Sequence, residues 1–298
     1  MKISRRSFLT LLLLGGAGTV SILGFNELAK THTFIPAGNP KESMSADMEN
    51  MPVPADQDNP LPNNANMALG MIIDTDKCDG CQNGKVYQIN ADKFEPRCTA
   101  ACRTMHNAPP EQEWIKIYYA KDNPMNEGYY FPRVCMQCQR PPCVRVCPVG
   151  AAYHRPFNHD GTGPGDGLVL IKYQRCIGCR VCMASCPYTA RYFNWAKYDE
   201  PNKNILKYHS PMYATKRTLG TVEKWDFCAH LGYGGKLPAC AQACNKGAIY
   251  YGNLKENTVT NAFLDSIPVR ETITNRMGYR LKEELGTHPR VYYLPKKS

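Results

Sequence analysis

The sequence predicts an α+β fold, rich in loops, in which short strands and short helices hold several groups of cysteines. Two observations favour this class. The 298 residues include 15 cysteines, 23 glycines and 23 prolines, so few stretches are long enough for extended helices. Strand-like runs also lead into two of the cysteine groups, MIID at Met71–Asp74 and LVLIKY at Leu168–Tyr173.

The charge and the motif content exclude several classes of protein. The formal net charge of +10 at pH 7 indicates a solvated basic surface, because no DNA- or RNA-binding motif accompanies it. The sequence also contains no nucleophile–base set, P-loop or dinucleotide fingerprint, so we expect no substrate chemistry in this chain.

The N-terminus has the pattern of a twin-arginine (Tat) export signal. Arg5 and Arg6 stand in SRRSFLT and precede an apolar stretch from Phe8 to about Phe25. Transport of this type moves folded proteins, so we expect the protein in the periplasm or at the outer face of the cytoplasmic membrane. Residues 1–29 are then a signal that is removed or an uncleaved membrane anchor. Residues 30–66 are predicted to be a linker, or an arm laid over a partner.

The third cysteine group reads CIGCRVCMASCP and contains Cys176, Cys179, Cys182 and Cys186. Its spacing, C-x2-C-x2-C-x3-C-P, is typical of the bacterial-type ferredoxins that hold 4Fe–4S clusters. Three closely spaced thiolates bind three irons of one cluster, and the fourth binds a second cluster. We expect the fourth cysteine to begin a helix, with Pro187 in its first turn.

The first group has an insertion. Its cysteines are Cys78, Cys81, Cys98 and Cys102. The insert QNGKVYQINADKFEPR, residues 82–97, is predicted to loop out as a small hairpin that returns Cys98 to the position of the third ligand. The alternative is that Cys98 is a bystander and that the cluster differs.

The remaining two groups complete the set. The second, CMQCQRPPCVRVCP, contains Cys135, Cys138, Cys143 and Cys147. The fourth, WDFCAHLGYGGKLPACAQAC, contains Cys228, Cys240 and Cys244. Trp225 stands three residues before Cys228, where a C-x2-C partner is expected, so one ligand is missing from this group.

The cysteine groups are copies of one unit. The second continues CPVGAAY, the third CPYTARY and the fourth CNKGAIY, after the last cysteine of each. Each pair of groups therefore predicts one pseudo-symmetric two-cluster domain.

This arrangement resembles the four-cluster ferredoxin-type iron–sulfur subunits of respiratory membrane complexes. The resemblance lies in the spacing of two groups. The second is spaced C-x2-C-x4-C-x3-C and the last C-x11-C-x3-C, as in the beta subunits of dimethyl sulfoxide, polysulfide and tetrathionate reductases. Subunits of sulfite-reduction-associated complexes and of alternative complex III are similar too. The similarity covers about residues 70–262, and the tail GYRLKEELGTHPRVYYLP is also similar to the ends of exported members.

The resemblance implies how ligands are shared. The implied sets are Cys78, Cys81, Cys98 with Cys244; Cys228, Cys240 with Cys102; Cys135, Cys138, Cys143 with Cys186; and Cys176, Cys179, Cys182 with Cys147. It also implies that residues 67–133 and 215–262 form one ferredoxin domain, that residues 134–214 form an inserted one, and that 263–298 are a C-terminal tail.

Trp225 leaves the cluster of Cys102, Cys228 and Cys240 with three thiolates. We expect a 3Fe–4S cluster there and 4Fe–4S clusters at the other three sites. Asp226 or His230 as a fourth ligand, or complete loss of this cluster, are the alternatives.

The function implied is a non-catalytic electron-transfer subunit of a respiratory oxidoreductase complex. Its expected partners are a polysulfide-reductase-type, quinone-interacting integral membrane subunit and a molybdopterin or multihaem cytochrome subunit. An independent exported ferredoxin-like carrier is the alternative within electron transfer. The alternative outside electron transfer is a binding protein whose cysteines hold zinc or form disulfides, although zinc sites usually use separated C-x2-C pairs.

Overall fold

The computed structural model describes residues 67–81, 87–90, 93–109, 111–121, 127–155, 166–198, 209–210, 213–214, 218–233 and 235–297. The Tat-like segment 1–29 and the expected arm 30–66 lie outside the described residues. Within the described ranges, no helix has the length and the apolar character that crossing a bilayer requires.

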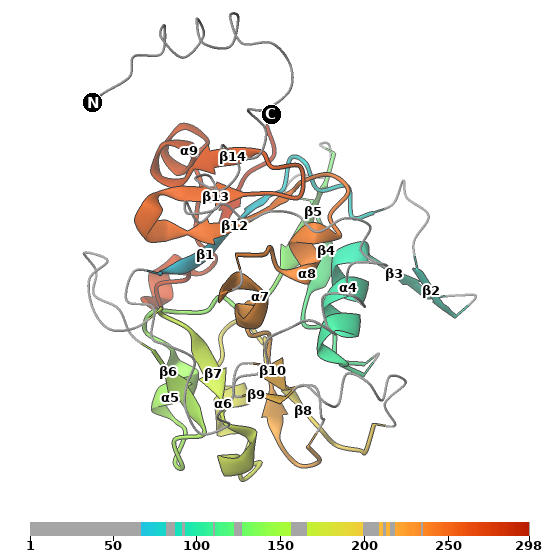
Figure 1. Ribbon diagram of the computed structural model, residues 1–298, viewed down its shortest axis with the longest axis vertical. Coiled ribbons are helices and arrows are strands. Elements are labelled where there is room, and N and C mark those ends of the chain that lie inside the picture. The colour runs from blue at the N-terminus through green and yellow to red at the C-terminus, as the bar shows by residue number, and fades with distance from the viewer. Residues whose placement is uncertain are drawn as a thin grey trace, which may run out of the picture. The chain divides into compact units, whose positions relative to one another are not determined.

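The fold alternates short strands with short helices, as the glycine and proline content and the strand-like runs predicted (Figure 1). The strands are β1 (Leu69–Asp74), β2 (Tyr87–Asn90), β3 (Lys93–Glu95), β4 (Lys116–Ala120), β5 (Tyr129–Arg133), β6 (Ala152–His154), β7 (Val169–Ile171), β8 (Tyr192–Phe193), β9 (His209–Ser210), β10 (Tyr213–Ala214), β11 (Val222–Glu223), β12 (Ile249–Asn253), β13 (Thr258–Thr260), β14 (Ser266–Pro268) and β15 (Val291–Leu294). The helices are α4 (Arg97–His106), α5 (Pro142–Arg145), α6 (Val181–Ala184), α7 (Ala229–Tyr233), α8 (Ala239–Gln242) and α9 (Val269–Asn275). Single 3₁₀ turns lie at Tyr173–Arg175, Leu254–Glu256 and Glu283–Leu285.

The largest sheet has five strands in the order β14-β13-β12-β1-β15. The strand predicted from MIID is confirmed as β1, which is buried along its whole length. It pairs antiparallel with β12 and parallel with β15. A strand with neighbours on both sides and both faces covered is expected to be apolar at successive positions, as LGMIID is.

The two faces of this sheet belong to different parts of the core. Met71 and Ile73 point to the side that contains Cys98, Cys138 and other cysteines. Ile72, on the opposite face, joins a separate cluster with Val269 of α9. One face of the sheet therefore supports the cysteine sites, and α9 covers the other.

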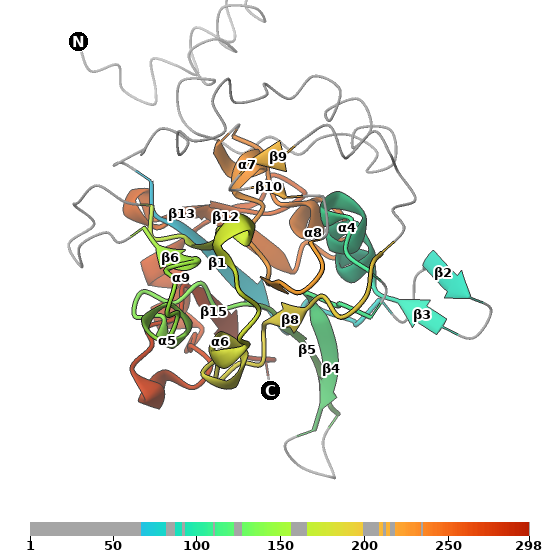
Figure 2. The same ribbon diagram turned by 90° about the horizontal axis from the view of Figure 1, so that it is seen from below.

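The short helices lie in pairs. Helix α4 lies beside α8 and α5 beside α6, as the two views agree (Figures 1 and 2). The predicted hairpin in the first insert is confirmed as the antiparallel pair β2 and β3. Strand β7 confirms the strand expected within Leu168–Tyr173, and it pairs antiparallel with β6.

The expected helix after the fourth cysteine is wrong. Helices α5 and α6 contain the third cysteines, Cys143 and Cys182, and end before Cys147 and Cys186. In the second group the chain enters its helix at Pro142, which occupies the first turn and needs no N–H partner. Pro187 instead lies in the turn that follows α6, where a proline prevents the helix from continuing.

A buried arginine near the C-terminus ties the sheet to distant loops. Arg290 is fully buried and donates hydrogen bonds to the backbone carbonyls of Leu69 (2.8 Å), Gln137 (2.9 Å), Asp166 (2.7 Å) and Gly167. The segment beyond residue 262 thus supplies two strands of the sheet and a polar clamp within the core.

Candidate metal centres

Four turns share one backbone feature next to a cysteine. The residue directly before the second C-x2-C position is left-handed in each group: Gly80 (φ 62°), Gln137 (φ 45°), Gly178 (φ 71°) and Phe227 (φ 69°). Gln137 and Phe227 are not glycine, and residues other than glycine rarely adopt a left-handed conformation. The shared conformation therefore indicates that the same turn is formed in each group. The fourth group therefore forms the same turn as the others, and Trp225 occupies the position that a first cysteine holds elsewhere.

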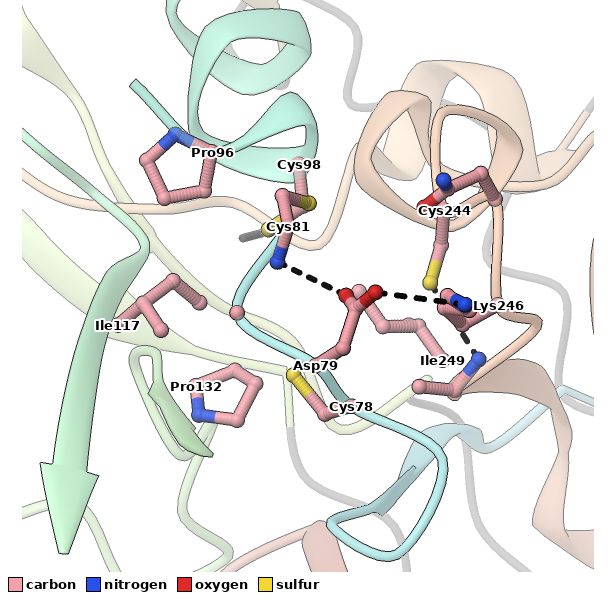
Figure 3. Close-up of a pocket in the computed structure, with 13 residues that line it drawn as sticks. Cys78, Asp79, Cys81, Pro96, Cys98, Ile117, Pro132, Cys244, Lys246 and Ile249 are labelled. Atoms are coloured by element: carbon pink, nitrogen blue, oxygen red, sulfur yellow. Dashed lines mark hydrogen bonds and ion pairs between the residues drawn. The ribbon is translucent and has the colours of Figure 1, made fainter. Parts of the chain in front are cut away.

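Site 1 is a cavity of about 360 Å³, open to solvent on one side, between the loop after β1, α4 and the turn after α8 (Figure 3). Its thiols are those of Cys78, Cys81, Cys98 and Cys244. The Asp79 carboxylate accepts a hydrogen bond from the Cys81 backbone N–H (2.9 Å) and faces Lys246 at 3.4 Å. Apolar side chains, including Ile117 and Ile249, complete the lining.

Site 2 and site 3 have nearly the same size. Site 2, about 330 Å³, has the thiols of Cys135, Cys138, Cys143 and Cys186. Site 3, about 340 Å³, has the thiols of Cys147, Cys176, Cys179 and Cys182. Arg191 is part of the lining of both sites.

Each of the three sites combines three cysteines from one group with one from another. Cys244 of the fourth group completes site 1, Cys186 of the third completes site 2, and Cys147 of the second completes site 3. The structure therefore brings together the same three sets of four that the family resemblance implied. All fifteen cysteines lie among the described residues, and none of them forms a disulfide.

The acidity of the thiols is set by burial and by their neighbours. Burial, and then repulsion from Cys135, raises the pKa of Cys138 to about 12. Burial, and then Cys244, raises the pKa of Cys98 well above its ordinary value. Protonated, buried thiols are poor nucleophiles, whereas a cationic metal centre replaces their protons and relieves the repulsion among them.

Backbone N–H groups also point at the sulfurs. Ala152 donates to Cys147 Sγ at 3.4 Å, and Ala248 donates to Cys244 Sγ at 3.3 Å. Burial raises the pKa of Cys147, but the N–H groups of Ala152 and Val149 more than offset this, so the pKa is lowered. Such N–H···S contacts stabilise thiolates and tune the potentials of iron–sulfur clusters.

The donor sets fit iron–sulfur clusters. Each of sites 1, 2 and 3 is lined by four thiols and by apolar side chains, and four thiolates are the ligand set of a 4Fe–4S cluster.

Site 4 brings together Cys102 of α4, Cys240 of α8 and Cys228, which directly precedes α7. Cys102 interacts electrostatically with both of the other cysteines. Trp225 is fully buried and stacks on Phe227, with ring centroids 4.8 Å apart. A buried indole thus stands at the chain position where the other groups have their first cysteine.

His106 is a site 4 residue that sequence reasoning missed. Its Nε2 lies 3.2 Å from Cys228 Sγ and 3.5 Å from an Asp226 carboxylate oxygen. His230, the histidine singled out from the sequence, instead has its ring edge toward His106, with centroids 5.7 Å apart. The sequence could have indicated that His106 lies near this site, because His106 follows Cys102 by four residues in α4 and therefore lies on the same face of the helix.

The sites are arranged in succession. Cys98 of site 1 interacts with Cys240 of site 4. The buried Lys224 interacts with Cys135 of site 2 and with Asp226 beside site 4. Since Arg191 lines sites 2 and 3, adjacent sites follow in the order 1, 4, 2, 3.

Comparison with known proteins agrees with this chemistry. Residues 126–205 match a family described as a 4Fe-4S dicluster domain. The chain is 35% identical over 241 residues to "Hdr-like menaquinol oxidoreductase iron-sulfur subunit 1" of Archaeoglobus fulgidus, covering 75% of this chain and 81% of that protein. It is 35% identical over 258 residues to "Menaquinone reductase, iron-sulfur cluster-binding subunit" of Nitratidesulfovibrio vulgaris, covering 76% and 89%.

A third relative extends the range of complexes. The chain is 30% identical over 259 residues to "Arsenate respiratory reductase iron-sulfur subunit ArrB" of Shewanella sp. (strain ANA-3), covering 76% of this chain and 96% of that protein. All three are named as subunits, which favours the subunit interpretation over an independent carrier. The chain therefore belongs to the family of 4Fe–4S dicluster-type iron–sulfur subunits of membrane-associated oxidoreductase complexes, and its role is electron transfer.

Proposed function

We propose that sites 1, 2 and 3 each hold a 4Fe–4S cluster, that site 4 holds a 3Fe–4S cluster, and that the chain passes electrons along all four. The observation that carries this is the crossed composition of the sites, in which three thiols from one group meet a fourth from another. When bound, each cluster takes up and releases one electron without any bond to a substrate.

The three-iron cluster at site 4 is supported by Trp225 and by His106. Three thiolates suit the cluster that lacks a corner iron, and Trp225 stands at the chain position that a first cysteine holds in the other groups. His106 Nε2 is at hydrogen-bonding distance from Cys228 Sγ, 3.2 Å. A ligand of a separate iron would stand farther from that sulfur, so the role we assign to His106 is a donor to the thiolate.

Two pseudo-symmetric halves are the proposed organisation, with residues 134–214 inserted between 67–133 and 215–262. The repeated segments support it, because the third residue after the last cysteine is left-handed in each: Gly150 (φ 62°), Thr189 (φ 50°) and Gly247 (φ 59°). The antiparallel pairs β1–β12 and β6–β7 stand in equivalent places in the two halves.

The proposed path runs through sites 1, 4, 2 and 3 between two partner subunits. Cys179 of site 3 is the exposed one among the fifteen cysteines, so this end of the path approaches the surface, where a partner must make contact. Relatives named for menaquinol and menaquinone support one partner of the quinone-interacting, polysulfide-reductase membrane type. The other partner we propose is a molybdopterin or multihaem cytochrome subunit, at the outer face of the membrane after Tat export.

Single Cys→Ser variants test the crossed ligand sets. In low-temperature EPR of the anaerobically reduced protein, Cys186→Ser should alter the same cluster signal as Cys138→Ser. Cys147→Ser should alter the signal that Cys179→Ser alters. If Cys186→Ser changes the Cys179 signal instead, ligands are not shared between groups and the proposed sites are wrong.

A further inference from the structure

Arg191 breaks the pattern of the repeat in which it stands. The repeated segment after each last cysteine reads CPVGAAY, CPYTARY and CNKGAIY. The residue equivalent to Arg191 is Ala152 in the second group and Ile249 in the fourth, and both are buried. A cation in a position that is otherwise small or apolar is expected to have a functional reason.

The guanidinium of Arg191 is buried between two cysteine sites. Its residue is 4% exposed, and it lines both site 2 and site 3. None of its three side-chain nitrogens makes a hydrogen bond of normal geometry within the described parts of the chain, and its polar partners are the thiols of Cys143 in site 2 and Cys182 in site 3. Burial lowers its pKa, but the neighbouring Cys143 and Cys182 more than offset this, so the pKa is raised.

Arg290 provides the contrast within the same core. It is equally buried, but its guanidinium donates to four backbone carbonyls and so has an evident structural role. Five donors of a buried guanidinium left without such partners cost several kcal/mol unless another acceptor is present. Arg191 is the one described residue that lines both cavities, and the acceptors available to it there include the sulfurs of Cys143 in site 2 and Cys182 in site 3.

We propose that Arg191 is a tuning residue for two clusters at once: from between sites 2 and 3 its guanidinium donates to sulfurs on both sides and raises both reduction potentials. This inference rests on the proposed function. Each reduction adds one electron from the donor to one cluster and neither makes nor breaks a bond. The fixed positive charge favours the more negative, reduced form of both clusters.

The size of the effect follows from Coulomb's law. A unit charge about 8 Å from an added electron, at an effective dielectric constant near 20, changes the equilibrium constant for adding that electron by about thirtyfold. We therefore expect removal of the charge to lower the equilibrium constant for one-electron reduction by about tenfold or more at each of the two sites. Tenfold corresponds to ~59 mV for one electron.

The experiment is an EPR-monitored redox titration of the full-length, cluster-loaded protein and of three variants. Arg191→Met removes the charge and keeps an unbranched side chain. Arg191→Lys keeps the charge but loses the planar guanidinium and its five N–H donors. Arg145→Met is the matched control, because Arg145 is exposed, stands between Cys143 and Cys147 in the sequence and is absent from the linings of both sites. Cys138→Ser and Cys179→Ser identify the signals of sites 2 and 3.

Arg191→Met should lower the potentials of sites 2 and 3 together and leave those of sites 1 and 4 unchanged. Arg191→Lys should recover more than half of the shift, and Arg145→Met should change the constants of sites 2 and 3 less than twofold. Unchanged potentials in Arg191→Met, or a shift at one site only, would overturn the inference.

The lysine variant keeps the test decisive if Arg191→Met does not assemble. Arg191→Lys should then show smaller shifts in the same direction at both sites, and a change at one site or none counts against the inference. Absence of clusters from the wild-type protein would contradict the proposed function itself, so the two failures are distinct.

Discussion

Trp225 determines how many thiols surround site 4. The turn that leads into Cys228 has the same left-handed residue as the three C-x2-C turns, so a cysteine at position 225 would begin it in the ordinary way. Instead the indole is fully buried against Phe227. One substitution in an unchanged turn therefore separates a three-thiolate site from a four-thiolate site.

Trp225→Cys should convert the three-iron cluster at site 4 into a four-iron one. The new thiol restores the missing ligand, although loss of the indole removes packing of about 3 kcal/mol or more. Low-temperature EPR of the oxidised protein should lose the signal of the 3Fe–4S cluster, and the iron content should rise by about one atom per chain.

Trp225→Ser is the matched control, because it creates a similar cavity without a thiol. It should retain the oxidised signal. A signal that persists in Trp225→Cys would show that the indole does not stand in a ligand position.

The cysteines that one group contributes to a site could be predicted from their local spacing, whereas the cysteine of another group that completes each site was implied by the family resemblance. His106 and Arg191 could not be assigned to their sites in the same way. The spacing from Cys102 puts His106 on the same face of α4, but its contact with Cys228 depends on how α4 packs beside the fourth group. Arg191 lines two sites only because the segment after Cys186 reaches both of them. Both depend on contacts between segments far apart in the chain.

At the scale of elements, strands were easier to predict than helices. MIID and LVLIKY are apolar runs with flanking polar residues, and β1 and β7 confirm them. The helix expected to begin at the last cysteine lies before it instead, because Pro142 in one group and the left-handed Arg180 in another start the helix earlier. In so short a helix, a shift of one turn changes which cysteine it contains.

Strand β15 and its neighbour Arg290 could not be recognised from the tail sequence. The segment GYRLKEELGTHPRVYYLP has charges that suggest a surface tail, yet Arg290 and Val291 are fully buried. The parallel partner of β15 is β1, more than two hundred positions away in the chain. Pairing at that separation leaves no local signal.

Arg290→Met should destabilise the protein by about 3 kcal/mol or more, because several buried carbonyls lose their donor. The measurement is anaerobic denaturant unfolding, followed by the loss of cluster absorbance. Arg270→Met, an exposed arginine in the first turn of α9, is the control and should change stability by less than about 0.5 kcal/mol. Equal stability of the two variants would exclude the clamp.

At the scale of the whole molecule, the cysteine sites are part of the core rather than attachments to it. Cys98, Cys102, Cys138 and Cys240 belong to the main apolar cluster, together with Trp225 and the inner face of the five-stranded sheet. Thiols buried in this way repel one another as thiolates, so binding of metal and folding are coupled. The relatives named as iron–sulfur subunits show the family, and cysteine sites built into the core agree with the electron-transfer role.

The most direct test of an iron–sulfur electron relay is the metal and sulfide content of the protein purified without oxygen. Three 4Fe–4S clusters and one 3Fe–4S cluster predict about 15 iron atoms per chain, with a similar amount of acid-labile sulfide. The brown colour should bleach on reduction. A colourless protein that contains zinc instead of iron, and no inorganic sulfide, would contradict the account.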